Sequence, residues 1–127
     1  MLMVDKILNI SKDKAETKFL ITKENILVDE NYFSEAGLIE NIAQTCSAIV
    51  GQNYFEDETS KVKLIGFITN IKKINIHQLP KVGDEIITKA KLVSQYENIC
   101  NIACETFFNE NLLIEAEINL FIKEVES

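Results

Sequence analysis

The clearest pattern in the chain is a strict alternation of apolar and polar residues near its C-terminal end. One set, facing one way, is Leu112, Ile114, Ala116, Ile118, Leu120 and Ile122. Glu115, Glu117, Asn119 and Lys123 face the other way. Such alternation predicts a strand with one face on a core and one in water.

Three more strands are predicted upstream of this one. Residues 85–96 and 99–108 are separated by a short polar connection, and the even positions of the second, from Cys100 to Phe108, form its more apolar face. The segment Val62–Ile76 is rich in β-branched residues and has apolar residues on both faces, which is typical of a central strand. The turn between residues 79 and 84 separates it from the next strand.

The period changes in the middle of the chain. From Ser34 to about Asn53, the apolar residues recur at steps of three and four, which predicts one long helix. Its apolar stripe is wide enough for the helix to be largely buried. Ser34 suits the N-cap, and Glu35 suits the positive end of the helix dipole.

Two short alternating segments, residues 4–10 and 15–21, predict a hairpin before the helix. A hairpin, a buried helix and four antiparallel strands can cover that helix only if the sheet curves around it. The predicted fold class is therefore α+β: a curved antiparallel sheet of about six strands wrapped around one long central helix. This is the hotdog architecture, expected as a single domain over residues 1–127.

Charge and composition narrow the function classes. The net charge of −7 disfavours nucleic-acid binding, because phosphate contacts need clustered basic residues. The one candidate basic patch brackets the 62–76 strand and consists of Lys61, Lys63, Lys72 and Lys73. The first residues lack the apolar stretch of a signal peptide, and no apolar run approaches the roughly 20 residues of a membrane span. We expect a cytoplasmic protein.

The cysteines and the single histidine give no metal site and no disulfide framework. The three cysteines are Cys46, Cys100 and Cys104. Their odd number and their spacing favour buried free thiols. With one histidine in the chain, a zinc site has too few ligands.

Motifs spread over nearly the whole chain resemble those of a known family. They are MLMVDKIL at residues 1–8, LIENIAQ at 38–44, Gly66-Phe67-Ile68, LPKVGDEI at 79–86 and Glu115-Ala116-Glu117. Together they resemble the 3-hydroxyacyl-acyl-carrier-protein dehydratases, including relatives from aryl-polyene-type pathways. The resemblance implies a lyase of fatty acid or polyketide-type biosynthesis that needs no cofactor.

Dehydration of a 3-hydroxyacyl thioester needs a base for the C2 proton, an acid for the departing hydroxyl and a donor to the thioester oxygen. The resemblance assigns Glu40 as the acid–base candidate and the backbone N–H of Gly37 as the donor. It also implies an acyl tunnel lined by residues such as Phe33, Leu38, Gly66 and Phe67. The alternatives are that Glu40 belongs to a polar strip with Asn41 and Gln44, that Gly37 only permits close packing, and that the apolar residues are ordinary core.

The family's catalytic histidine has no counterpart here. The family carries it on a loop before the helix, whereas this chain passes directly from Phe33 to Ser34, and its only histidine, His77, lies at the far end of the 62–76 strand. We expect a surface or edge-strand role for His77.

Three hypotheses remain open: a dehydratase-like enzyme that relies on Glu40, a non-catalytic subunit that binds an acyl chain or pairs with a histidine-bearing paralogue, and a thioesterase that uses Glu40. The acyl group would be carried by acyl carrier protein or coenzyme A. Pairing of the 62–76 strand across subunits would give a homodimer or a hetero-oligomer.

Overall fold

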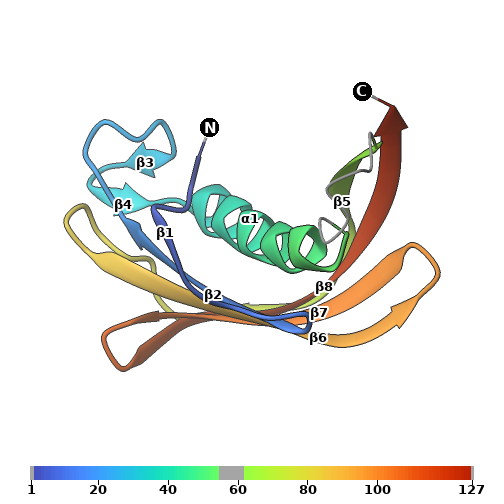
Figure 1. Cartoon of the computed structure of the whole chain (residues 1–127). Helices are drawn as coiled ribbons and strands as arrows, with labels where there is room; N and C mark the ends of the chain where they lie inside the picture. Colours follow the sequence, from blue (N-terminus) through green and yellow to red (C-terminus); the bar gives the residue numbers. More distant parts are fainter. Residues whose placement is uncertain (1, 55–61, 127) are drawn as a thin grey trace.

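The sheet of the protein curves around one helix, as the sequence predicts (Figure 1). The computed structural model describes residues 2–54 and 62–126, and the side chains among them apart from 50–54, 62–67 and 124–126. The helix α1 spans Glu35–Tyr54. The six-stranded sheet has the order β1-β2-β6-β7-β8-β5, with every neighbouring pair antiparallel. The fold is the hotdog fold.

The strand bounds match the alternating segments of the sequence closely. The six strands of the sheet are β1 (Lys6–Ile10), β2 (Lys14–Leu20), β5 (Val62–Ile76), β6 (Glu85–Tyr96), β7 (Ile99–Phe108) and β8 (Asn111–Glu126). A small ribbon of β3 (Val28–Asp29) and β4 (Tyr32–Phe33), absent from the sequence prediction, precedes the helix.

The helix begins where its capping residue predicts. Ser34 Oγ accepts a hydrogen bond from the Gly37 N–H at 3.2 Å, and the Ser34 carbonyl accepts one from the Leu38 N–H at 3.1 Å. The first bond satisfies an N–H group that the first helical turn leaves without an intrahelical partner, and the second is the first i→i−4 bond of the helix. Ser34 therefore fixes the start of α1.

The prediction of a central strand at Val62–Ile76 is wrong for the isolated chain. In the described part of the chain, β5 pairs with β8 alone and forms one edge of the sheet. The register shifts between Ile68 and Asn70 and between Ile71 and Lys73. Each bulge adds a residue, so Ile68, Ile71 and Ile74 all align with inward-facing residues of β8. Apolar residues of one face therefore occur at both odd and even residue numbers, so the sequence alone suggests a strand with two apolar faces.

The inner face of the sheet carries rows of matched side chains that receive the helix. One row consists of small residues in register, namely Ala15, Ala90, Cys104 and Ala116. The next row contains Thr17, Thr88 and Thr106. Small side chains let the helix approach closely, and Cys46 Sγ of α1 lies 3.3 Å from Cys104 Sγ. The threonine row supplies hydroxyl groups to the polar residues of the helix.

Candidate functional site

Two of the motifs that carry the family resemblance contact each other. Asn41 and Gln44 of α1 hold the backbone of Met3 from both sides. Asn41 Nδ2 donates to the Met3 carbonyl at 2.6 Å, and the Met3 N–H donates to Gln44 Oε1 at 2.6 Å. The Met3 side chain is buried against the core. These polar residues therefore fasten the N-terminal segment to the helix.

Asn41 also links the helix to the threonine row of the sheet. Thr88 Oγ1 donates to Asn41 Oδ1 at 2.5 Å and lies 2.8 Å from Thr106 Oγ1. Asn41 is fully buried, and its amide oxygen and nitrogen both have partners. A buried amide with satisfied hydrogen bonds fixes the position of the helix on the sheet. Asn41 therefore has a structural role that the sequence did not assign.

Glu40 lies on the outer side of the same helical turn and is exposed to solvent. Its Oε1 accepts a hydrogen bond from Gln44 Nε2 at 3.2 Å. Gln44 thus bridges the carboxylate of Glu40 and the backbone of Met3. The polar-strip alternative describes Glu40 and Gln44, whereas Asn41 points into the core.

Gly37 is tightly enclosed at the start of the helix. An ideal Cβ at this position would lie 2.5 Å from two ring atoms of Phe33, so a close approach of the backbone to this ring requires glycine. The Gly37 N–H is already donated to Ser34 Oγ. To bind a thioester carbonyl, this N–H would have to leave its capping partner.

The four candidate tunnel residues divide into two groups. Phe33 and Leu38 are each 0% exposed and belong to the core of the chain. The backbones of Gly66 and Phe67 pair with Ile122 and Phe121 of β8. The side chain of Phe67 lies outside the described residues, as do those of Lys61 and Lys63. The structure therefore brings Phe33, Leu38 and Gly37 together at the helix start and leaves the β5 pair on the edge strand.

The turn that contains Pro80 supports the segment before the helix. The Phe33 N–H donates to the Pro80 carbonyl at 2.8 Å, and Lys81 Nζ lies 5.6 Å from the ring centre of Tyr32. Gly83 in the same turn has a φ of +94°, a conformation that favours glycine. β4, bonded to this turn, thus leads directly into α1 through Ser34.

His77 directly follows β5 and is exposed. Its N–H donates to the Leu113 carbonyl at 2.8 Å, which ties the end of β5 to the start of β8. This position agrees with the expected surface or edge role. Within residues 2–54 and 62–126, no group of His, Cys, Asp and Glu side chains could hold a metal ion.

The three cysteines are free and buried. The hydrogen bond with Cys104 and burial raise the pKa of the Cys46 thiol well above its ordinary value, and burial raises the pKa of Cys100. The raised pKa values keep the thiols of Cys46 and Cys100 protonated at neutral pH, and all three cysteines pack as small apolar groups. None of the helices in the described residues is long and apolar enough to cross a membrane.

A family model for the ApeP-like proteins, described as ApeP dehydratase, matches residues 1–127. The chain belongs to the ApeP-like dehydratase family. No curated protein sequence matches it. The family assignment agrees with the aryl-polyene-type relatives that the motifs resemble.

Several solved structures are similar to this ApeP-like chain. The dehydratase heterocomplex ApeI:P from Xenorhabdus doucetiae has a TM-score of 0.83 at 14% identity, with 94% of this chain and 82% of that chain covered. A hypothetical thioesterase with coenzyme A from Streptococcus pneumoniae TIGR4 has a TM-score of 0.69 at 14% identity over 96% and 88% of the two chains. A sigma28-regulated virulence protein from Campylobacter jejuni has a TM-score of 0.75 at 15% identity over 95% and 85%. At these identities the likeness shows the hotdog fold.

Proposed function

We propose that this ApeP-like chain is the acyl-thioester-binding subunit of a hotdog hetero-oligomer, in which a second subunit supplies the histidine for dehydration. The observation that carries the proposal is the helix start, where Phe33 enters the core and Ser34 caps α1 with no loop between them. The only histidine, His77, is held at the end of β5. Glu40 therefore offers a carboxylate without a base beside it in its own chain.

The edge strand β5 is the surface that would receive the second subunit. Ile71 and Ile74 are each 37% exposed there, and the unpaired backbone groups of an edge strand readily accept another strand. Pairing across this edge would join two sheets into one. The ApeI:P heterocomplex, a structure of similar fold, supports a hetero-oligomer in preference to a homodimer.

In the shared site the chemistry divides between the subunits. The partner's imidazole would take the C2 proton of a 3-hydroxyacyl thioester. Glu40 would donate a proton to the C3 hydroxyl, and this hydroxyl would then leave as water. The exposure of Glu40 in the single chain suits a group that serves a site completed by another subunit. Gln44, which donates to Glu40, would orient the carboxylate.

The test compares the chain alone with a complex made by co-expression with a histidine-bearing hotdog protein encoded beside it. Enoyl formation from 3-hydroxyacyl thioesters of acyl carrier protein and of coenzyme A is followed for both. We expect product from the complex only, and Glu40→Gln in the complex should slow it by about 10²-fold or more, as for loss of a general acid. Glu35→Gln, which removes an exposed carboxylate from the first turn of the same helix, should have little effect.

Two results would contradict this proposal. Rapid enoyl formation by the chain alone would show that it needs no partner base. Equal rates for the complex with and without Glu40→Gln would remove Glu40 from the site.

The free state of all three cysteines supports a reducing compartment such as the cytoplasm for the assembly.

A thioesterase that uses Glu40 is the second candidate. The similarity to a hypothetical thioesterase with coenzyme A favours it. The capping bond of the Gly37 N–H weighs against it, because this N–H would be the donor to the thioester oxygen. Hydrolysis of acyl-coenzyme A by the chain alone, abolished by Glu40→Gln, would favour the thioesterase.

A further inference from the structure

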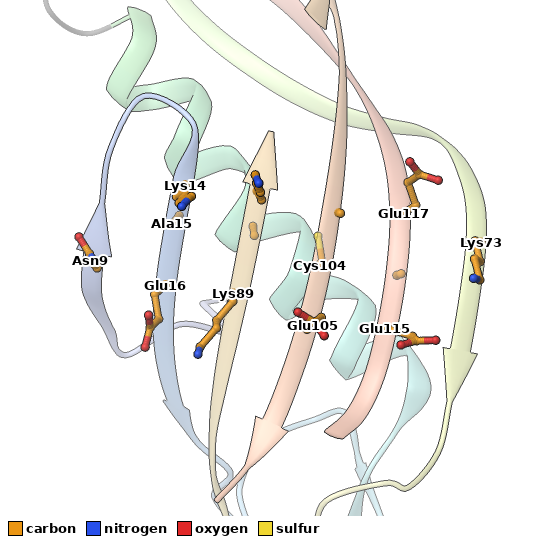
Figure 2. A pocket seen from close by; sticks show the side chains of 14 residues that line it. Asn9, Lys14, Ala15, Glu16, Lys73, Lys89, Cys104, Glu105, Glu115 and Glu117 are labelled. Atoms are coloured by element: carbon orange, nitrogen blue, oxygen red, sulfur yellow. The ribbon is translucent and has the colours of Figure 1, made fainter. Parts of the chain in front are cut away.

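A continuous set of hydrogen bonds leads from the threonine row in the core to the carboxylate of Glu40. Its members, in order, are Thr106, Thr88, Asn41, the backbone of Met3, Gln44 and Glu40. We call this set the Thr106–Glu40 network. Figure 2 shows the strands from their outer side, which carries a depression of about 550 Å³, with α1 behind them. The network begins on the opposite, inner side, between the sheet and the helix.

The backbone of Met3 determines which way the two amide side chains of the network point. A carbonyl only accepts and an N–H only donates, so the Met3 carbonyl must face Nδ2 of Asn41, and the Met3 N–H must face Oε1 of Gln44. Nε2 of Gln44 then points toward the carboxylate of Glu40 and donates to it at 3.2 Å. If the Gln44 amide turned over, its oxygen would face the carboxylate and the bond would be lost.

The threonines determine the direction of the bonds at the other end of the network. Asn41 Oδ1 lies in the core and accepts the hydrogen of the Thr88 hydroxyl. Because that hydroxyl has one hydrogen, the Thr106 hydroxyl is the donor in the 2.8 Å contact between the two threonines. Every bond of the network therefore has its donor on the side of the core and its acceptor on the side of Glu40.

Stability alone does not account for these buried polar side chains. Thr88, Thr106 and Asn41 are each 0% exposed. Replacing all the partners of a buried hydrogen bond by apolar groups of the same shape can be neutral or stabilising, whereas a fully satisfied polar network specifies one arrangement of the groups in it. Asn41 directly precedes Ile42 in the core and directly follows Glu40, so an arrangement fixed at Asn41 is fixed at the turn of α1 that carries the carboxylate.

We propose that Thr88 and Asn41 are positioning residues for Glu40, which they hold through Met3 and Gln44. Their role rests on the proposed function, in which Glu40 donates a proton to the C3 hydroxyl of the substrate. Glu40 is exposed in the single chain, and the hydrogen bond that the described residues show to its carboxylate comes from Gln44. The orientation of this carboxylate matters for the rate, because a misplacement of about 1 Å can slow a reaction by about 10²-fold.

The experiment compares Thr88→Val with Thr17→Val in the complex with the histidine-bearing subunit. The two threonines are cross-strand neighbours, 0% and 1% exposed, so each substitution removes one buried hydroxyl from the same row. Thr17 bonds to Thr45, which donates to the backbone carbonyl of Asn41, so Thr17 lies outside the network. We expect Thr88→Val to lower kcat for enoyl formation about tenfold and to change KM less than about twofold, whereas Thr17→Val should change both less than about twofold.

Two further variants separate positioning from stability. Thr88→Ser keeps the hydroxyl and loses a buried methyl group, so it should lower the midpoint of thermal unfolding and keep the kcat of the wild type. Gln44→Met removes the bond to Glu40, so Thr88→Val should lower kcat no further in that background. Equal losses of kcat in Thr88→Val and Thr17→Val would overturn the proposal, and so would additive losses from Thr88→Val and Gln44→Met.

A measurement on the full chain without its partner distinguishes failure of this proposal from failure of the proposed function. In NMR spectra of isotope-labelled protein, the side-chain amide signals of Gln44 report its bond to Glu40. We expect Thr88→Val to move these signals toward their positions in Glu40→Ala, and Thr17→Val to leave them in place. Unmoved signals in Thr88→Val would overturn the network whatever the activity of the complex. The expected movement, together with a complex that forms no enoyl product, would support the network and contradict the proposed function.

Discussion

Gly37→Ala is the substitution for which the structure gives the most direct energetic expectation. The backbone at Gly37 is helical, so an alanine there meets no backbone strain and its cost comes from the space around its methyl group. The new methyl carbon would lie 2.5 Å from two atoms of the Phe33 ring, whereas carbon atoms pack at about 3.5–4.0 Å. The ring would have to move by about 1 Å. It is 0% exposed and lies 5.7 Å from the ring of Phe19, so it has little space to move into.

The expected magnitude follows from two opposing effects. Overpacking a well-filled core costs about 1–3 kcal/mol. Replacing glycine by alanine within a helix contributes about 0.5–1 kcal/mol in the other direction. The free energy of unfolding should therefore fall, by up to about 2.5 kcal/mol. Urea unfolding followed by circular dichroism measures it, at one fixed protein concentration because association stabilises the folded state.

Making Gly37→Ala in a Phe33→Leu variant tests whether contact with the Phe33 ring causes the loss of stability. Phe33→Leu removes the ring atoms that the methyl group would meet, so in that background Gly37→Ala should be neutral or stabilising. The two substitutions should thus couple by about 1 kcal/mol or more, as contacting residues do. A stabilising Gly37→Ala in the wild type, or the same effect in both backgrounds, would refute the packing argument.

Two further predictions concern buried polar groups. Asn41→Ala should lower the free energy of unfolding by about 2–3 kcal/mol, because the Met3 carbonyl and the Thr88 hydroxyl lose a partner; denaturant titration measures this, and a loss below about 0.5 kcal/mol would contradict the network. The raised pKa of Cys46 means that stability is complete below the unfolded thiol pKa of about 8.5 and falls as the pH rises beyond it, since the unfolded state then releases a proton that the folded state keeps. Cys46→Ala should flatten this alkaline loss in a pH series of thermal unfolding, and an unchanged slope would assign it to other groups.

The helix and the β6–β8 meander could be predicted from the sequence because each follows one simple period. The N-cap at Ser34 and the alternation in β8 depend on neighbours within a few residues, so local physics determines them. The position of β5 could not be predicted in the same way. Its two bulges hide the period of the strand, and its place at the edge depends on pairing with a distant segment.

The sequence motifs named candidate residues for a site but not the contacts of these residues. Glu40, Gly37 and Phe33 were identified from motifs, yet the capping bond of Gly37 and the solvent exposure of Glu40 appear only in three dimensions. The role of Asn41 was missed because its partner is the backbone of Met3, which any residue type could provide.

The pairing of β5 with β8 also affects how the chain folds while it is being translated. β5 precedes β6 and β7 in the sequence, but its partner in the sheet is β8, the last strand of the chain. Val62 at the start of β5 pairs with Glu126 at the end of β8. Until β8 emerges from the ribosome, β5 has both of its edges open. A neighbouring polypeptide translated nearby could pair with it during that interval, before the sheet closes. Long-range pairing of this kind slows folding and exposes strand edges, so the order of translation can influence which subunit the chain joins.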